Sequence, residues 1–242
     1  MKTKIGEQLN IFRTIKEDFC NIKRNDPALH SVFEIFFNYP GLWALFFHRV
    51  AHSLYKRGLR FIPRVISGLS RFVTTVDIHP AAQIGERLFI DHAAGVVVGE
   101  TAIIGNDVVI YQQVTLGGVS TSSGKRHPTV GNNVVIGAGA KVLGNITIGD
   151  NAKIGANSVV VKDVPCCATA VGIPARIINC NDTKNEELRH DMIPDITKEV
   201  LNYLFKRIAV LEETIKTGDI KLMEKEDHEL TEIYSSFIKS MR

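Results

Sequence analysis

Between residues 78 and 160 the sequence returns to an aliphatic residue at every sixth position, and few folds accommodate such a period. The period of six matches neither the 3.6 residues of a helix turn nor the 2.0 of a strand. It does match a parallel β-helix, in which a short strand and a tight turn form one face of a triangular prism and three faces close a coil of about 18 residues. The aliphatic positions form three runs, each out of step with the one before: Ile78, Ile84 and Ile90; Val98, Ile104, Ile110 and Leu116; Val130, Ile136, Val142, Ile148, Ile154 and Val160.

Turn-forming residues follow the repeat aliphatics at regular places. They are Gly85, Gly105, Gly131, Gly137, Gly149 and Gly155, and then Asn106, Asp107, Asn132, Asn133, Asp150 and Asn151. These residue types tolerate the positive φ angles that corners require. The whole span predicts roughly four to five stacked coils around a continuous column of Val and Ile. A sandwich of short strands would instead show alternating patterns and irregular spacing.

Charge divides the chain around this prism. Residues 1–76 hold 12 Lys+Arg and 5 Asp+Glu, residues 77–178 hold 7 of each, and residues 179–242 hold 10 and 14. We therefore expect an N-terminal helical domain, a β-helix catalytic domain and a C-terminal helical tail with these boundaries, giving an α+β fold. The net charge of only +3 argues against nucleic acid as a principal partner, because phosphate binding needs a clustered basic surface.

The N-terminal part predicts about three helices, because apolar residues recur there at helical spacing in residues 5–22, 32–37 and 42–54. Polar residues, Pro40 and Gly41 interrupt its most hydrophobic stretch well short of the ~20 apolar residues of a membrane span. The first residues also lack the features of a secretory signal. A cytoplasmic protein without membrane contact is expected.

The tail predicts two helices separated by residues 217–219, with Gly218 as a C-cap. One heptad seam stands out in the first of them: Leu201, Leu204, Ile208, Leu211 and Ile215. Two heptads fall below the three or four that define a coiled coil. A short coiled coil between chains and a helix packed on its own subunit both remain open.

Cysteines and histidines give no sign of a metal site. The four cysteines fit neither a disulfide framework nor a zinc knuckle, and we expect them to be reduced: Cys20, Cys166, Cys167 and Cys180. A γ-type carbonic anhydrase would need three histidines around zinc, including a close pair. His79, His92 and His127 are 13 and 35 residues apart. No metal is expected.

Asp77 and His92 are the candidates for acid–base chemistry. They are 15 positions apart, three short of a full coil, so they are able to lie on neighbouring coils near one corner. A carboxylate that fixes the tautomer of an imidazole while the other nitrogen takes a proton is a common general-base arrangement. The pattern alone is weak, since a solvated turn holds such pairs more often than a catalytic site does, and His79 is expected only to pack in its turn.

Motifs across residues 20–178 resemble those of the serine O-acetyltransferases, in order and spacing. They are Asp77 to Ala82, Asp91-His92-Ala93, Val97 to Thr101, Val114 to Gly118, Arg126-His127-Pro128, Ile136 to Ala140 and Gly172 to Arg176. The resemblance implies a left-handed β-helix and transfer of acetyl from acetyl-CoA to L-serine, giving O-acetyl-L-serine for cysteine synthesis. It implies that His92 is the general base and Asp77 the carboxylate that orients it. An imidazole with a pKa near 6.5 suits removal of the serine proton during direct attack on the thioester.

The resemblance also implies the groups that bind the two substrates. Asp26 and Asp91 match contacts to the amino group of serine, and Arg126 and His127 match contacts to its carboxylate. Asp26 also fits a helix N-cap before Pro27, and Glu100 is a supporting carboxylate. The expected acetyl-CoA residues are small groups lining a groove and two cations for phosphate or adenine: Gly118, Ala138 and Ala156, then Lys153 and Arg176.

The implied partners are further copies of the chain and small molecules. The groove of such enzymes lies between two prisms, which implies a homotrimer or a higher homo-oligomer. Because the N-terminal part is short, trimer and hexamer both remain open. L-Cysteine, which shares the amino and carboxylate groups of serine, is an expected feedback inhibitor. The sequence ends in Ser240-Met241-Arg242 and not in the isoleucine that inserts into cysteine synthase, so that complex is not expected. Two rival functions remain: an O-acetyltransferase of a sugar or polysaccharide, which would not need the charged set for a zwitterion, and a scaffold that only binds.

Overall fold

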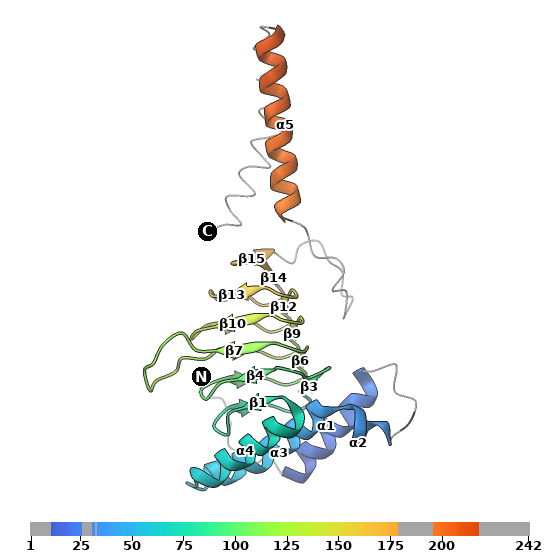
Figure 1. The fold of residues 1–242 in the computed structure, drawn as a ribbon, viewed down its shortest axis with the longest axis vertical. Helices are drawn as coiled ribbons and strands as arrows, with labels where there is room; N and C mark the ends of the chain where they lie inside the picture. The colour runs from blue at the N-terminus through green and yellow to red at the C-terminus, as the bar shows by residue number, and fades with distance from the viewer. Residues whose placement is uncertain (1–10, 26–30, 32, 179–195, 218–242) are drawn as a thin grey trace. The chain divides into compact units, whose positions relative to one another are not determined.

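The computed structural model describes residues 11–25, 31, 33–178 and 196–217 (Figure 1). Contacts divide the chain into two units, residues 1–186 and 187–242, and each is described by itself. In the first unit, four helices lie at one end of a column of stacked short strands (Figure 1).

The column is a parallel β-helix with three sheets, which we call A, B and C. Sheet A holds β1 (Asp77–Ile78), β4 (Val97–Val98), β7 (Thr115–Gly117), β10 (Lys141–Leu143) and β13 (Val159–Val160). Sheet B holds β2 (Gln83–Ile84), β5 (Ile103–Ile104), β8 (Thr129–Val130) and β11 (Thr147–Ile148). Sheet C holds β3 (Phe89–Ile90), β6 (Val109–Ile110), β9 (Val135–Ile136), β12 (Lys153–Ile154), β14 (Thr169–Gly172) and β15 (Ala175–Ile178). The chain visits A, B and C in turn, and only the last pair, β14 and β15, is antiparallel.

The six-residue period is confirmed as the core of the prism. The second residue of each strand from β1 to β13 is a repeat aliphatic, and all of these are buried. A second buried position lies two residues earlier, where the side chain points the same way along an extended segment. Small residues such as Ala82, Ala102, Ala140 and Ala152 occupy it. Burial of each Ile or Val contributes about 1.5–3 kcal/mol, so the column carries most of the stability.

The corners combine left-handed backbone at non-glycine residues with close stacking at glycines. The expectation of positive φ at these glycines is wrong. Left-handed backbone at the corner between sheets B and C falls on Arg87, Asp107, Asn133 and Asn151. The glycines are needed for close stacking instead. A Cβ on Gly85 would lie 2.6 Å from the carbonyl oxygen of the glycine one coil above it, so only a residue without a side chain fits.

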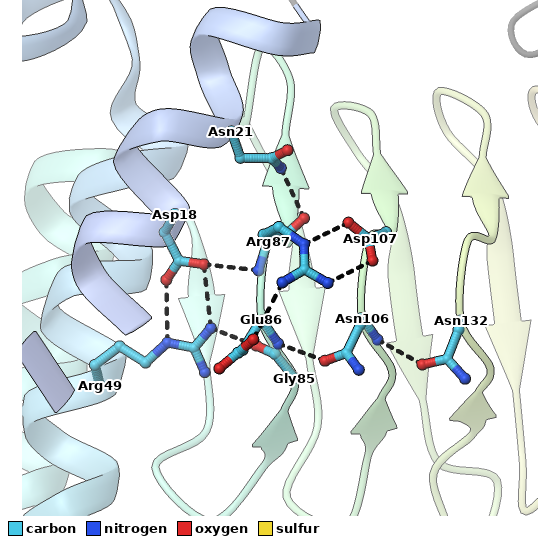
Figure 2. A network of polar contacts seen from close by, with 9 residues as sticks. All are labelled: Asp18, Asn21, Arg49, Gly85, Glu86, Arg87, Asn106, Asp107 and Asn132. Atoms are coloured by element: carbon cyan, nitrogen blue, oxygen red, sulfur yellow. Dashed lines mark hydrogen bonds and ion pairs between the residues drawn. The ribbon is translucent and has the colours of Figure 1, made fainter. Parts of the chain in front are cut away.

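A ladder of amide and carboxylate side chains joins successive coils at the B/C corner. The backbone N–H of Glu86 donates to Asn106 at 2.7 Å, that of Asn106 donates to Asn132 at 2.9 Å, and that of Asn132 donates to Asp150 at 2.6 Å. Figure 2 shows the first two steps. Each side-chain oxygen accepts a turn N–H that the parallel ladders leave unpaired, which fixes the vertical register of the coils.

The N-terminal helices are α1 (Ile11–Asn25), α2 (Glu34–Asn38), α3 (Pro40–Lys56) and α4 (Phe61–Thr74). Helix α4 was not predicted. Its apolar residues lie mostly on an exposed face, with Phe61, Phe72 and Val73 all more than half exposed. Its small and polar residues Ser67 and Ser70 are buried, which reverses the pattern that identifies a core-facing helix.

A buried ion pair attaches these helices to the first coil (Figure 2). Arg49 of α3 contacts Asp18 of α1 at 3.2 Å and donates to the carbonyls of Ile84 and Gly85 at 2.6 Å each. Asp18 also accepts the backbone N–H of Arg87 at 3.1 Å. Burial raises the pKa of the Asp18 carboxyl, and Arg49 opposes that shift. Removal of one partner would leave a buried charge, which costs about 3–5 kcal/mol.

The N-terminus of α3 packs against the end of β3. A Cβ on Gly41 would lie 2.3 Å from the carbonyl oxygen of Ile90. The absence of a side chain at Gly41 thus lets the helix approach the residue that precedes Asp91 and His92. The helices therefore support the first coil directly beneath the polar residues that follow β3.

The second unit contains helix α5 (Ile196–Thr217). The five residues of the expected seam all lie within this helix, and Leu201, Leu204, Ile208, Leu211 and Ile215 are each exposed by more than a third. The opposite side holds Val210, which is buried. The second expected tail helix lies outside the described residues. The two boundaries expected between the three domains remain a prediction.

Candidate active site

The corner between sheets C and A in the first coil bears His92. Asp77 pairs with Val97, twenty positions on, whereas Val97 pairs with Thr115, eighteen positions on, so the first coil is two residues longer. The extra length falls at His92 and Ala93, which both adopt left-handed backbone, with φ of 56° and 49°. Ala93 is buried, while the His92 side chain is 73% exposed. The insertion thus projects an imidazole into solvent from a fixed corner.

Asp77 lies at the same C/A corner, as the spacing predicts. Its backbone N–H donates to Val96 at 2.9 Å, and Gly95 donates to Thr75 at 3.1 Å, so the segment after His92 stacks on the start of β1. The side chains, however, have other partners in the single chain. Asp77 contacts Arg71 of α4 at 3.3 Å, and His92 Nε2 lies 3.8 Å from the Asp91 carboxylate. The expected contact between Asp77 and His92 is not formed among the described residues.

The second polar site lies at the corner between sheets A and B. Thr115 pairs with Lys141, twenty-six positions on, so this coil has eight extra residues, which project from the column between β7 and β8 (Figure 1). The loop returns through Lys125, Arg126 and His127. The ammonium of Lys125 donates to the carbonyls of Thr101 and His127 at 2.6 Å each and to that of Pro128 at 3.1 Å. One cation thus ties the end of the loop to the coil below.

His127 is enclosed at this corner. Its Nδ1 lies 2.9 Å from the hydroxyl and 3.2 Å from the backbone nitrogen of Thr101. A Cβ on Gly99 would lie 2.0 Å from the ring, and one on Gly118 would lie 3.2 Å from Nε2. The ring therefore fits between two glycines. Burial lowers the pKa of His127, as do Arg126 and Lys125, while Glu100 acts in the opposite direction.

Arg126 is held by Glu100 in the single chain. Its guanidinium contacts the Glu100 carboxylate at 2.5 Å and donates to the carbonyl of Ser122 at 3.2 Å. The hydrogen bond from Arg126 lowers the pKa of Glu100. Glu100 therefore lies where it would orient the fork of Arg126, and its supporting role stays a prediction.

The expected acetyl-CoA residues divide between the two corners. Ala138 and Ala156 follow strands of sheet C and stand above His92 at the C/A corner, whereas Gly118 is at the A/B corner. Lys153 lies in β12 and Arg176 in β15, both in sheet C. Asp26 lies outside the described residues. One chain thus places the expected base and the expected carboxylate-binding groups at opposite edges of sheet A.

Comparison with known proteins decides the family. The family model "Bacterial transferase hexapeptide (six repeats)" matches residues 127–162. Serine acetyltransferase of Synechococcus elongatus is 52% identical over 206 residues, which cover 85% of this chain and 84% of that protein. That of Bacillus subtilis is 46% identical over 215 residues, which cover 88% and 99%. This chain belongs to the serine acetyltransferase family.

Solved structures of serine acetyltransferases agree. The soybean enzyme complexed with serine has a TM-score of 0.67 and 48% identity, covering 69% of each chain. A serine acetyltransferase in complex with CoA has a TM-score of 0.66 and 44% identity, also covering 69% of each chain. The prism is accordingly a left-handed parallel β-helix of hexapeptide repeats.

Several residues at the candidate site of this chain were not predicted from the sequence. They are Gly99, Thr101 and Lys125, which together hold His127. Their roles depend on how the inserted loop folds back, which no local pattern shows. His79 behaves as expected, since its Nδ1 accepts the N–H of Ala81 within its own turn at 3.0 Å.

The described residues hold neither a cluster of metal ligands nor a helix that could span a membrane. No three His, Cys, Asp or Glu side chains among the described residues come together as a metal site would need. None of the described helices combines the length and the apolar character needed to cross a bilayer.

Proposed function

We propose that this protein transfers the acetyl group of acetyl-CoA to the hydroxyl of L-serine, with His92 as general base. The observation that carries the proposal is the exposed imidazole of His92 on its left-handed insertion, at the foot of the corner that also bears Ala138 and Ala156. Family membership and the relatives' names support the same reaction. The product is O-acetyl-L-serine, and we place the protein in the cytoplasm.

The chemical step needs one proton carrier. His92 takes the proton of the serine hydroxyl as its oxygen forms a bond to the thioester carbonyl carbon. The C–S bond then breaks, and the imidazolium returns the proton to the sulfur of CoA. Asp91, 3.8 Å from Nε2, stabilises the imidazolium. For Asp77 we retain the orienting role, which requires its carboxylate to leave Arg71.

Acceptor binding follows from the charges of L-serine. Arg126 and His127 bind the carboxylate, since a guanidinium fork matches its two oxygens. Asp91 and Asp26 bind the ammonium group. L-Cysteine presents the same two charged groups, and a solved serine acetyltransferase has been crystallised in complex with cysteine. We therefore propose L-cysteine as a competing inhibitor at this site.

The active unit is a homotrimer in this proposal. His92 and Arg126 occupy the two edges of sheet A, so a single chain does not assemble a site from both. Threefold packing sets the C/A corner of one prism against the A/B corner of the next. Acetyl-CoA then lies between prisms, along Ala138 and Ala156 of one chain and Gly118 of its neighbour, with Lys153 and Arg176 as cationic contacts.

Two experiments test these claims. CoA release from acetyl-CoA is measured with L-serine, L-homoserine and a sugar as acceptors. Equal rates would reject L-serine as the preferred acceptor. A higher rate with the sugar would favour a sugar acetyltransferase. For the shared site, His92→Asn and Arg126→Met are each purified alone, where each should be inactive, and are also co-expressed so that mixed trimers form. Random trimers should regain about one quarter of wild-type activity. A mixture as inactive as its components would reject the shared site.

A further inference from the structure

The contacts around His127 fix more than its position. The hydroxyl oxygen of Thr101 lies 3.0 Å from the backbone nitrogen of Arg126 and 3.1 Å from that of His127. Both nitrogens are donors, and a hydroxyl oxygen has two lone pairs. Both lone pairs therefore accept hydrogen bonds, so in any further hydrogen bond the hydroxyl acts as the donor.

That proton has one acceptor within reach, Nδ1 of His127 at 2.9 Å. The backbone N–H of Thr101 donates to the same nitrogen at 3.2 Å. Nδ1 thus receives two hydrogen bonds and has no room for a proton of its own. A neutral imidazole with a bare Nδ1 carries its proton on Nε2.

Nε2 is the open end of the ring. It makes no hydrogen bond to the described residues. It is also not one of the fully buried polar atoms without a partner, so it is accessible to solvent. The glycines Gly99 and Gly118 flank it without filling the space in front of it. A single N–H donor is therefore presented beside the guanidinium of Arg126.

The charged surroundings favour the neutral ring. Lys125 and Arg126 approach from the loop, and both oppose a further positive charge. Glu100 from the turn after β4 acts the other way, but its carboxylate is already paired with Arg126. His79, two coils below, is a further titratable group near the ring, and it adds repulsion when protonated.

We propose that Thr101 is a positioning residue which locks His127 as the neutral Nε2–H tautomer, so that it donates one hydrogen bond to the acceptor's carboxylate. The proposal rests on the proposed function for the identity of that carboxylate. The positive charge that recognises the acceptor then comes from Arg126 alone. The site discriminates by geometry at His127 and by charge at Arg126.

Nuclear magnetic resonance on the protein labelled with ¹⁵N-histidine tests the tautomer without reference to any reaction. The His127 signals are assigned by their loss in His127→Asn. We expect Nδ1 to show the shift of an unprotonated nitrogen and Nε2 that of a protonated one at pH 8. In Thr101→Val, where Nδ1 loses the hydroxyl donor, both neutral tautomers should be populated. A wild-type ring protonated on Nδ1, or with the same mixture of tautomers as the variant, would overturn the proposal.

Kinetics at pH 7.5 test the consequence. In Thr101→Val the KM for L-serine should rise roughly tenfold, the factor that one buried hydrogen bond is worth, with kcat within about twofold. Thr101→Ser should restore the KM. Thr147→Val is the matched control, because the Thr147 hydroxyl is exposed and makes no contact in the described structure. An unchanged KM in Thr101→Val would reject the role in binding. Wild-type protein that fails to acetylate L-serine but shows the expected resonances would instead reject the proposed function.

Discussion

At the C/A corner His92 extends from a two-residue insertion with most of its side chain in solvent, whereas at the A/B corner His127 is only 8% exposed. His92 has one carboxylate within 4 Å. His127 has a hydroxyl, a backbone amide and two glycines around it. The same residue type is thus free at one edge of sheet A and immobilised at the other.

The difference shows which functional groups the chain organises by itself. In the proposed function, groups that recognise a carboxylate are fixed before the substrate arrives, and the A/B corner fixes Arg126 and His127 with its own loop. His92, the proposed base, is mostly exposed among the described residues, so it needs a partner surface to define its surroundings. Variants at the two corners should therefore fail in different ways.

The largest effect is expected at the open corner. His92→Asn removes the proton acceptor but keeps a residue type that tolerates the left-handed backbone. We expect kcat to fall by about 10²–10⁴, the range typical of losing a general base. The melting temperature should stay near that of the wild type because the side chain is exposed. Retained activity would exclude His92 as the base and favour the scaffold alternative.

The enclosed corner should be sensitive to a single methyl group. In Gly99→Ala the new Cβ would lie 2.0 Å from the His127 ring, which must move. We expect the KM for L-serine to rise by tens-fold and stability to fall by about 1–3 kcal/mol, as overpacking does. Gly124→Ala is the control, since no atom lies within 4 Å of its Cβ position. Equal behaviour of the two variants would contradict the enclosure of His127.

Each of these corners also has a lysine that binds carbonyls, which offers a matched pair. Lys125 binds three carbonyls at the A/B corner, and Lys141 binds those of Gln113 and Gly139 at the C/A corner. Lys125→Met should raise the KM for L-serine about fivefold, since buried carbonyls lose their donor. Lys141→Met should leave that KM unchanged. An equal KM for L-serine in both variants would contradict the different roles of the two lysines.

Acid should weaken the part of the fold under the enclosed corner. Burial lowers the pKa of His48 in α3, and likewise those of His52, His79 and His127. Below about pH 6.5 the unfolded chain takes up protons that the folded one resists, so the free energy of unfolding falls with pH. His48→Met should reduce that fall by at most about 1.4 kcal/mol, because pH 5.5 lies one unit below the ordinary pKa of about 6.5. Urea titrations at pH 7.5 and 5.5 measure it; equal losses in both proteins would refute the assignment to His48.

The sequence predicts the prism well because each coil repeats one local rule. The aliphatic at every sixth position must be buried, and each phase break between the runs coincides with an insertion that the structure places at a corner. The spacing of Asp77 and His92 also predicts their shared corner. These features depend on residue order alone.

What the sequence does not reveal depends on contacts between distant segments. Arg71 of α4 takes the carboxylate of Asp77 that was expected to face His92, and α4 itself has an unusual exposed apolar face. Thr101 looks like an ordinary turn residue until the loop brings Arg126 and His127 onto its hydroxyl. Such roles follow from the fold and not from a pattern.

Both insertions leave the strands above and below them in register. A stack of coils in which each contacts only its neighbours gives evolution a place to add length without disturbing the scaffold. In the proposed function, binding of the acceptor's carboxylate is therefore modular. Grafting residues 117–128, together with the Glu100–Thr101 turn that receives them, onto another hexapeptide prism should transfer carboxylate binding while the host column stays intact.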